Sequence, residues 1–282
     1  MSTFTIHATT LPSGETVPVL GQGTWHMAEG RHPRDVEIEA LRFAINLGVT
    51  LIDTAEMYAD GGAEELVGEA IEGVRDEVFL VSKVLPSHAD REGTINACRA
   101  SLRRLQTNHI DLYLLHWRGD APLIETITAF EELRMLGAIR NWGVSNFDLA
   151  DMAELMELRD GDHVAANQVL YNLAHRGVEW DLLPWHQAQG IPLMAYSPIE
   201  QGRLLDHPAI RAIAERHHVT PAQVALAWVL REEGVIAIPE AGTQDHVKEN
   251  RAAVKLHLED EDLAELDRDF PPPSGPQPLA TH

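Results

Sequence analysis

The sequence contains a single cysteine, Cys98. One cysteine excludes an intrachain disulfide, and it also excludes a metal site built mainly from thiolates. The surrounding residues, Ile95 to Arg99, have the pattern of the middle of a helix. We therefore expect Cys98 to be a buried structural thiol and not a nucleophile.

Basic residues are scarce, and lysine especially so. There are 22 Lys and Arg residues against 44 Asp and Glu, a formal net charge of −22, and the only lysines are Lys83, Lys248 and Lys255. Binding to duplex nucleic acid requires Lys and Arg to neutralise phosphates, so the acidic excess rules against a nucleic-acid function. An anionic membrane surface is disfavoured for the same reason.

Long apolar runs are missing as well, since none approaches the roughly 18 residues needed to span a bilayer. Residues 1–7 lack the basic region and following apolar run of a signal peptide. We therefore expect a cytoplasmic protein without membrane association. No long amphipathic stripe indicates obligate assembly, and a monomer is the default expectation.

What the chain does contain is a regular alternation of short apolar runs and helix-like stretches. The runs predicted as strands are 19–25, 50–55, 78–84, 111–117, 139–146, 164–171, 192–197 and 235–239. The stretches predicted as helices are 35–47, 63–73, 93–105, 123–136, 149–157, 180–189, 221–233 and 245–253. Near-continuous apolar strands indicate burial on both faces, as in a parallel sheet.

Eight such pairs in 282 residues predict an α/β fold of the (β/α)₈ TIM-barrel type. A doubly wound sheet is the structural alternative, and it would normally carry a glycine-rich nucleotide turn after its first strand. Gly21 and Gly23 begin such a motif, but His26 stands where the third glycine belongs, and no helix signal occurs before Asp35. We interpret this segment as a failed dinucleotide fingerprint.

Additional elements flank the repeat. Two short strands, 5–9 and 16–19, surround a turn sequence and predict a β-hairpin that plugs the bottom of the barrel. Two extra helices are expected at 208–218 and 259–269. The proline-rich end predicts a flexible or extended tail over 271–282. No linker divides the chain, so we expect one domain over 1–282.

Four residues at or just after the predicted strand ends carry chemistry. Asp53, Lys83 and His116 end consecutive strands, and Tyr58 follows in the next loop. In a barrel of this type, the C-terminal strand ends face the active site. Lys83 would lower the pKa of Tyr58, and Asp53 would keep Lys83 charged, so that Tyr58 can donate a proton near neutral pH. Each residue alone has an ordinary structural explanation, but their coincidence in consecutive units favours the functional interpretation.

These residues belong to motifs by which the chain resembles the aldo-keto reductase superfamily. The motifs occur in the family's order and are Asp53–Tyr58, Val81–Val84, Leu114–Trp117, Gly143–Phe147, Asn167–Gln168 and Ala195–Pro198. The resemblance is greatest to compact bacterial reductases that include methylglyoxal reductases. It implies a nicotinamide cofactor, hydride transfer to an aldehyde or ketone, and a catalytic tetrad of Asp53, Tyr58, Lys83 and His116. Tyr58 would be the general acid of reduction.

The resemblance also implies where the cofactor binds. The matching positions near the nicotinamide and the pyrophosphate are Thr24, Trp25, Asp53, Ser145, Asn146, Gln168, Tyr196, Ser197 and Pro198. Ser145, Asn146 and Gln168 would hold the carboxamide. Tyr196 would stack on the nicotinamide ring, while Ser197 and the following loop would reach the pyrophosphate.

At the adenosine end the sequence departs from the family. Glu240 stands where the family usually has a lysine, and His246 where it has an arginine, whereas Glu249 and Asn250 match the residues that hold adenine. A carboxylate repels the 2′-phosphate of NADP(H) and can accept hydrogen bonds from the ribose of NAD(H). We predict that Glu240 weakens NADPH preference and that NADH is used comparably or better. Alternatively, Glu240 turns to solvent while Thr243, Gln244 and a protonated His246 bind the phosphate.

The substrate pocket by family position consists of Trp25, Met57, Tyr58, Leu85, Trp117 and Asn146. The loop after His116 and the C-terminal tail are short. We therefore expect an open, shallow site for small aldehydes, dicarbonyls or sugars, with methylglyoxal as a candidate substrate.

Three other functions fit the sequence less well than an enzyme of this kind. A cofactor-binding regulatory or redox-sensor protein of the same fold is the main alternative, and the intact tetrad argues against it. A metal hydrolase is disfavoured because the 15 histidines form no His-x-His or His-Glu-x-x-His motif. A serine hydrolase is excluded because Gly143–Phe147 lacks the second glycine of a nucleophile elbow.

Overall fold

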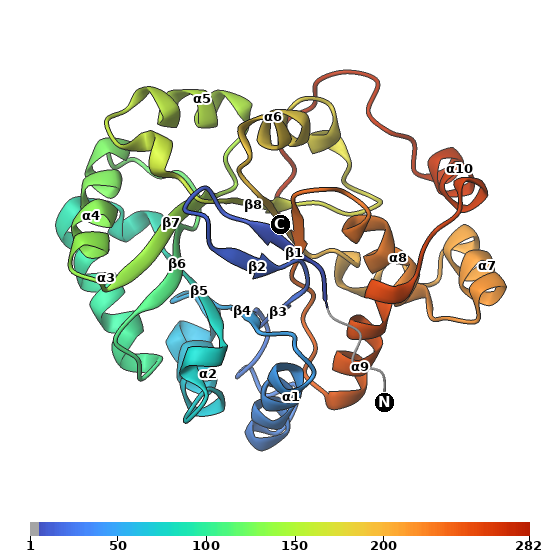
Figure 1. Cartoon of the computed structure of the whole chain (residues 1–282), viewed down its shortest axis with the longest axis horizontal. Coiled ribbons are helices and arrows are strands. Elements are labelled where there is room, and N and C mark those ends of the chain that lie inside the picture. The colour runs from blue at the N-terminus through green and yellow to red at the C-terminus, as the bar shows by residue number, and fades with distance from the viewer. Residues whose placement is uncertain (1–5) are drawn as a thin grey trace.

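A computed structural model describes residues 6–282 and shows eight parallel strands arranged as a barrel (Figure 1). Strand pairing runs in sequence order, from the first barrel strand to the last. The barrel strands are β3 (Gly21–Gly23), β4 (Leu51–Asp53), β5 (Phe79–Val84), β6 (Ile110–Leu115), β7 (Ile139–Ser145), β8 (Asn167–Leu170), β9 (Leu193–Tyr196) and β10 (Val235–Ala237). The predicted α/β barrel is confirmed.

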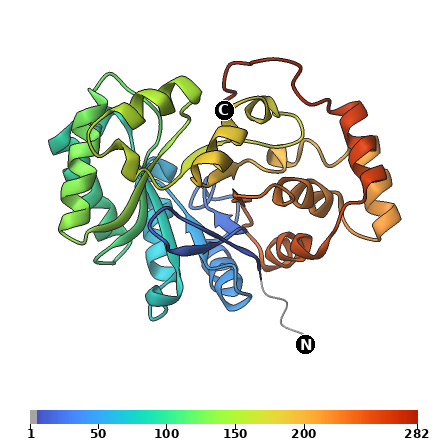
Figure 2. The same cartoon turned by 45° about the horizontal axis from the view of Figure 1, so that its top comes forward.

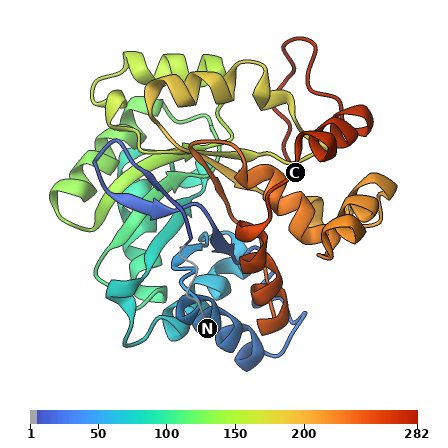
Figure 3. The same ribbon diagram turned by 45° about the vertical axis from the view of Figure 1, so that its right-hand side comes forward.

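Helices form a ring outside the strands (Figure 2). Those of the repeat are α1 (Arg34–Asn46), α2 (Gly62–Ala70), α3 (Arg91–Arg104), α4 (Leu123–Met135), α5 (Leu149–Glu157), α6 (Leu182–Gln189), α8 (Pro221–Leu230) and α9 (Gln244–Ala252). The two predicted extra helices are present as α7 (Pro208–His217) and α10 (Asp260–Asp269), which pack against each other (Figure 3). None of the helices described between residues 6 and 282 is long and apolar enough to cross a membrane.

The hairpin consists of β1 (Ala8–Thr10) and β2 (Thr16–Pro18), paired antiparallel across the end of the barrel that faces the viewer in Figure 1. Residue 5, the expected start of its first strand, lies outside the described residues. Leu11 and Val17 of the hairpin are buried in one cluster with inward-facing strand residues such as Leu51 and Leu112. The hairpin therefore covers the bottom and leaves the carboxyl ends of the strands for the site.

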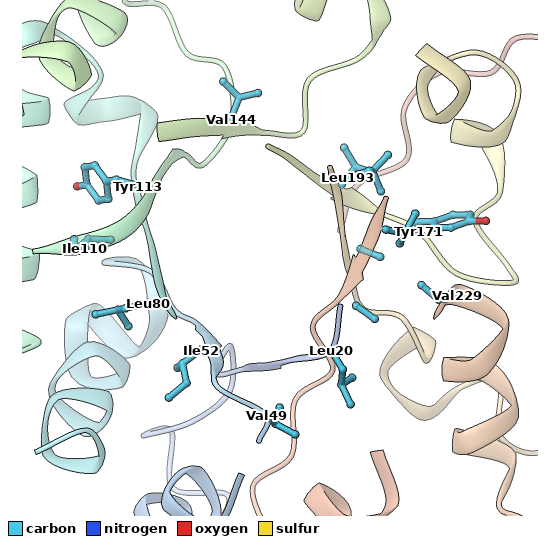
Figure 4. Packing of buried hydrophobic residues seen from close by; sticks show 14 of the residues in the cluster. Leu20, Val49, Ile52, Leu80, Ile110, Tyr113, Val144, Tyr171, Leu193 and Val229 are labelled. Atoms are coloured by element: carbon cyan, nitrogen blue, oxygen red, sulfur yellow. The ribbon is translucent and has the colours of Figure 1, made fainter. Parts of the chain in front are cut away.

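Alternate residues of each strand face either the barrel interior or the helices. Val81 and Leu114 belong to the interior cluster, whereas Leu80 and Tyr113 point outward, toward the helices (Figure 4). Cys98 on α3 is fully buried in this outer layer, and burial raises the pKa of its thiol to about 12. The predicted burial of this thiol is confirmed.

The barrel closes where Leu20 and β3 meet the end of β10 and the segment that follows it. Bridges join Leu20 to Ala237 and Gly23 to Glu240, and the backbone N–H of Gly23 donates to the carbonyl oxygen of Pro239 at 2.9 Å. A Cβ atom on Gly23 would lie 2.8 Å from the carbonyl oxygen of Ile238. The two glycines of the Gly-x-Gly sequence thus allow the strands at the seam to approach closely. This structural role accounts for the glycines without a nucleotide-binding turn.

We expect Gly23→Ala to destabilise the barrel, because the added methyl group would push two hydrogen-bonded strands apart. Overpacking of this kind costs about 1–3 kcal/mol, which lowers Tm by several degrees in a protein of this size. Thermal unfolding followed by circular dichroism measures the change. Gly275→Ala is the matched control, since nothing lies within 4 Å of its added Cβ. Equal Tm values for the two variants would contradict the account of the seam.

Candidate active site

The predicted tetrad comes together at the carboxyl ends of β4, β5 and β6. Lys83 is fully buried, and its Nζ donates to Asp53 Oδ2 at 2.7 Å, to the carbonyl oxygen of Thr54 at 2.8 Å and to the Tyr58 hydroxyl at 3.1 Å. His116 follows β6, and its ring lies edge-on to Tyr58, with 5.8 Å between the ring centroids. The ammonium group therefore links the carboxylate to the phenol directly.

Strand register explains why these side chains meet. Asp53 pairs with Val81 on β5, and Lys83 stands two residues farther along that strand and points into the same layer of the barrel. Tyr58 begins the short 3₁₀ helix η1 (Tyr58–Gly61), in which Ala59 and Asp60 have positive φ angles of 49° and 52°. Two consecutive left-handed residues other than glycine are strained, and such strain is typical of functional loops.

Burial and charge fix the protonation of the lysine and the tyrosine. Burial alone would lower the pKa of Lys83, but Asp53 and Tyr58 together outweigh burial and raise it, so the ammonium stays charged. Burial raises the pKa of Tyr58 above 10, and Lys83 opposes this rise only in part. The predicted effect of Lys83, a lowering of the pKa of Tyr58, is confirmed, but burial outweighs it, so the expected net lowering is wrong. Tyr58 is a neutral phenol at neutral pH.

His116 is uncharged as well. Burial, helped by the charge of Lys83, lowers the pKa of the imidazole to about 2. Its Nδ1 atom is buried and has no hydrogen-bond partner among residues 6–282. A neutral imidazole can donate one hydrogen bond without competing for the proton of Tyr58.

The tetrad opens into a cavity of about 540 Å³ at the mouth of the barrel. The predicted residues that line it are Thr24, Trp25, Asp53, Met57, Tyr58, His116, Trp117, Ser145, Asn146, Gln168, Tyr196, Ser197, Pro198, Glu240, His246, Glu249 and Asn250. Four predicted residues do not line it. Lys83 lies beneath the surface, Leu85 and Gln244 are absent from the lining, and Thr243 caps α9 by accepting the backbone N–H of His246.

One wall of the cavity carries a connected set of polar side chains. Ser145 donates to the carbonyl oxygen of Gln168 at 2.8 Å, and Gln168 Nε2 donates to Asp53 Oδ1 at 2.8 Å. Asn146 donates to the carbonyl oxygen of His116 at 3.1 Å and accepts from the Tyr196 hydroxyl at 3.0 Å. Amide, hydroxyl and aromatic groups in this arrangement suit a carboxamide and a flat ring.

The far end of the cavity is more charged than the sequence suggested. Glu240 accepts a backbone hydrogen bond from His26 and faces Arg31, and burial raises its pKa. The carboxylate is thus turned toward the loop after β3. At the base of this end, Asn250 has a buried Nδ2 atom without a partner in the part of the chain that the structure describes. An orphaned donor beside a cavity fits a bound heterocycle such as adenine.

Sequence reasoning missed several lining residues. His26, Arg31 and His32 lie in the loop after β3, and their position after a barrel strand was a signal that could have identified them. His282 also lines the cavity, although it belongs to a tail without helix or strand. The expectation of a short tail that leaves the site open therefore differs from the structure. No group of three His, Cys, Asp or Glu side chains within residues 6–282 is placed to hold a metal ion.

Known proteins are similar to this chain in sequence and in structure. Methylglyoxal reductase YeaE of Escherichia coli (strain K12) is 54% identical over 92% of this chain and 93% of its own. Glyoxal reductase of Bacillus subtilis (strain 168) is 37% identical over 91% of this chain and 90% of its own. A crystal structure of an aldo/keto reductase from Klebsiella pneumoniae in complex with NADP and acetate matches with a TM-score of 0.95 and 51% identity, covering 98% and 100% of the two chains. The sequence profile of the Aldo/keto reductase family matches residues 19–268, and the chain belongs to this family.

Proposed function

We propose that the protein reduces small aldehydes and ketones, including dicarbonyls such as methylglyoxal, with NADPH or NADH. The observation that carries the proposal is the buried contact of Lys83 with both Asp53 and Tyr58 beneath the cavity. It is supported by relatives named as methylglyoxal and glyoxal reductases and by a relative solved with NADP.

In the proposed reaction, the carbonyl carbon would accept a hydride from a bound reduced nicotinamide. Tyr58 donates its proton to the carbonyl oxygen as negative charge develops there. Charged Lys83 stabilises the phenolate that remains, and Asp53 keeps Lys83 charged. His116, as a neutral donor, orients the carbonyl oxygen. The high pKa of Tyr58 ensures that the proton is present before each turnover.

The polar wall would position the cofactor. Ser145, Asn146 and Gln168 would hold the carboxamide and Tyr196 would stack on the ring. The ribose and pyrophosphate would be flanked by Thr24, Trp25 and the loop that begins at Ser197 and Pro198. The adenosine would be flanked by His246, Glu249 and Asn250. Gln168 already bonds to Asp53, so cofactor position and lysine charge would depend on one network.

Small substrates suit the remaining space. Met57 and Trp117 are each 38% exposed at the rim and would form apolar walls with Trp25, while Asn146 adds a polar group. The regulatory alternative requires cofactor binding without turnover. It is not favoured, because the proton donor and its charged neighbour are both in place.

A panel of carbonyl compounds assayed with each cofactor tests the function. We expect turnover of methylglyoxal and other small dicarbonyls by the wild type. In Tyr58→Phe, kcat should fall by about 10²–10⁴-fold, because the general acid is lost, while cofactor binding measured by fluorescence is retained. A Tyr58→Phe variant with full activity would refute the mechanism, and cofactor binding by the wild type without turnover of any carbonyl would support the regulatory alternative.

We also propose that Glu240 lowers the preference for NADPH. The carboxylate faces the adenosine end of the cavity, and its contact with His26 argues against the alternative that it turns into solvent. Thr243, which that alternative assigns to the phosphate, is engaged as the cap of α9. Arg31, His32 and His246 line the same end and offer a partial counter-charge.

Replacing the carboxylate should shift cofactor use. Glu240→Lys should raise kcat/KM with NADPH relative to NADH by roughly 5–150-fold, the scale of one to three kcal/mol of electrostatic discrimination. Glu240→Gln is the matched control, since it removes the charge but keeps the shape, and it should give a smaller rise. A wild type with strong NADPH preference, or a Glu240→Lys variant with an unchanged ratio, would contradict the role of Glu240.

Three further expectations stay predictions from the sequence. These are a single domain over 1–282, a cytoplasmic location and a monomeric state without nucleic-acid or membrane partners.

A further inference from the structure

A buried ion pair lies behind the site, on the outer side of the barrel wall. Glu64, in the first turn of α2, is fully buried, and its Oε2 atom accepts from Arg104 Nε at 2.6 Å. Arg104 is the last residue of α3, and its side chain is 24% exposed. Neither residue lines the cavity. A carboxylate without exposure to water needs a charged partner, so the pair fixes both side chains.

The side chain of Arg104 packs against the turn that carries Tyr58. A Cβ atom on Gly61 would lie 2.6 Å from Arg104 Cδ and 2.7 Å from Arg104 Nε. Gly61 has a φ of 89° and ends the run of left-handed residues that begins at Ala59. Residues strained in this way keep their conformation only where the surrounding structure holds them. The arginine is one of the groups that hold this turn.

The other carboxylate oxygen of Glu64 contacts the strand that carries Lys83. Ser82 Oγ donates to Glu64 Oε1 at 2.6 Å, and Ser82 is fully buried. Ser82 and Lys83 are neighbours on β5, and neighbouring residues of a strand point to opposite faces. Lys83 therefore points into the barrel beneath the cavity, whereas Ser82 points outward to the ion pair.

Two sets of contacts thus join the turn to β5. On the inside, Lys83 Nζ donates to the Tyr58 hydroxyl at 3.1 Å. On the outside, Glu64 and Arg104 connect Ser82 to Gly61. The inner hydrogen bond alone leaves the strained backbone of the turn free to relax, and relaxation would move the phenol. The outer contacts hold that backbone in place.

We propose that Glu64 and Arg104 are positioning residues for proton donation: they hold the turn Tyr58–Gly61 against β5 and so keep the Tyr58 hydroxyl beside Lys83 and directed into the cavity. The inference rests on the proposed function, because it concerns the proton donor of that reaction. The pair acts through the turn alone. Its loss should slow proton donation without weakening the binding of substrate or cofactor.

Arg104→Ala removes both the ion pair and the contact with Gly61. The rate of NADPH oxidation by methylglyoxal in a single turnover should fall by about 10–100-fold, the effect of a small displacement of a reacting group. Single turnovers are measured because product release can limit kcat. The solvent deuterium isotope effect on this rate should rise, since proton donation becomes slower. KM for methylglyoxal and the Kd for NADPH should stay within about twofold, because ligand binding is untouched.

Arg75→Ala is the matched control, because it breaks a similar ion pair at the other end of the barrel. Arg75 precedes β5, and its Nη2 atom lies 2.7 Å from Asp111 Oδ2; the two side chains are 16% and 1% exposed. Both variants should lower Tm, since each removes a charged partner from a buried carboxylate. Only Arg104→Ala should slow the single turnover and raise the isotope effect.

Milder variants of the pair should have graded effects. Arg104→Lys keeps the positive charge and most of the stem, so it should retain most of the wild-type rate. Glu64→Gln keeps the shape of the side chain and a hydrogen-bonding group for Ser82, and it should behave similarly. Arg104→Met keeps a stem against Gly61 but loses the bond to Glu64, so its rate should lie between those of Arg104→Lys and Arg104→Ala. Arg104→Met also tests the inference if Arg104→Ala does not fold.

Several outcomes would overturn the inference. An unchanged single-turnover rate in Arg104→Ala, or in Arg104→Met if the alanine variant does not fold, would show that the pair does not position the donor. Equal losses of rate in Arg104→Ala and Arg75→Ala would indicate a general effect of destabilisation. Weaker NADPH binding with an unchanged single-turnover rate would place the effect on the cofactor. Absence of any carbonyl turnover by the wild type would instead refute the proposed function, on which the inference rests.

Discussion

The structure of the site depends on one interaction, the buried ion pair between Lys83 and Asp53. An ammonium group without exposure to water must have a charged partner, and removing one member of such a pair costs about 3–5 kcal/mol. Asp53 supplies this partner at 2.7 Å and is fixed in turn by Gln168 from the opposite side of the barrel. The ammonium group of Lys83 also donates a hydrogen bond to Tyr58. Protein stability and proton transfer therefore both depend on the ion pair between Lys83 and Asp53.

The barrel makes this arrangement possible by dividing two tasks between its ends. The hairpin and the interior apolar cluster close the bottom, where Leu11 and Val17 exclude water. At the top, the strand ends place polar residues in or just beneath a single cavity, and loops from distant parts of the chain complete it. The glycines at the seam allow the first and last strands to approach closely enough for closure.

Much of the site was predictable from the sequence because it is tied to strand ends. Asp53, Lys83 and His116 follow apolar runs, and parallel topology alone places them on one edge. The net pKa shift of Tyr58 was not predictable, because it depends on how completely the neighbouring chain buries the phenol. His282 gave no signal either, since its place is set by a tail that crosses the surface over other elements. Thr243 shows the converse case, in which a residue that the alternative interpretation assigned to the phosphate caps a helix.

The most direct test of the account is the ionisation of Tyr58, followed by ultraviolet absorbance of phenolate during a pH titration. Besides Tyr58, the chain has only Tyr113, Tyr171 and Tyr196, and burial raises the pKa of each of them as well. The account therefore predicts no phenolate signal in the wild type below about pH 10. A phenolate that forms near neutral pH in the wild type and is missing in Tyr58→Phe would contradict it, since Tyr58 would then be ionised before it could donate a proton.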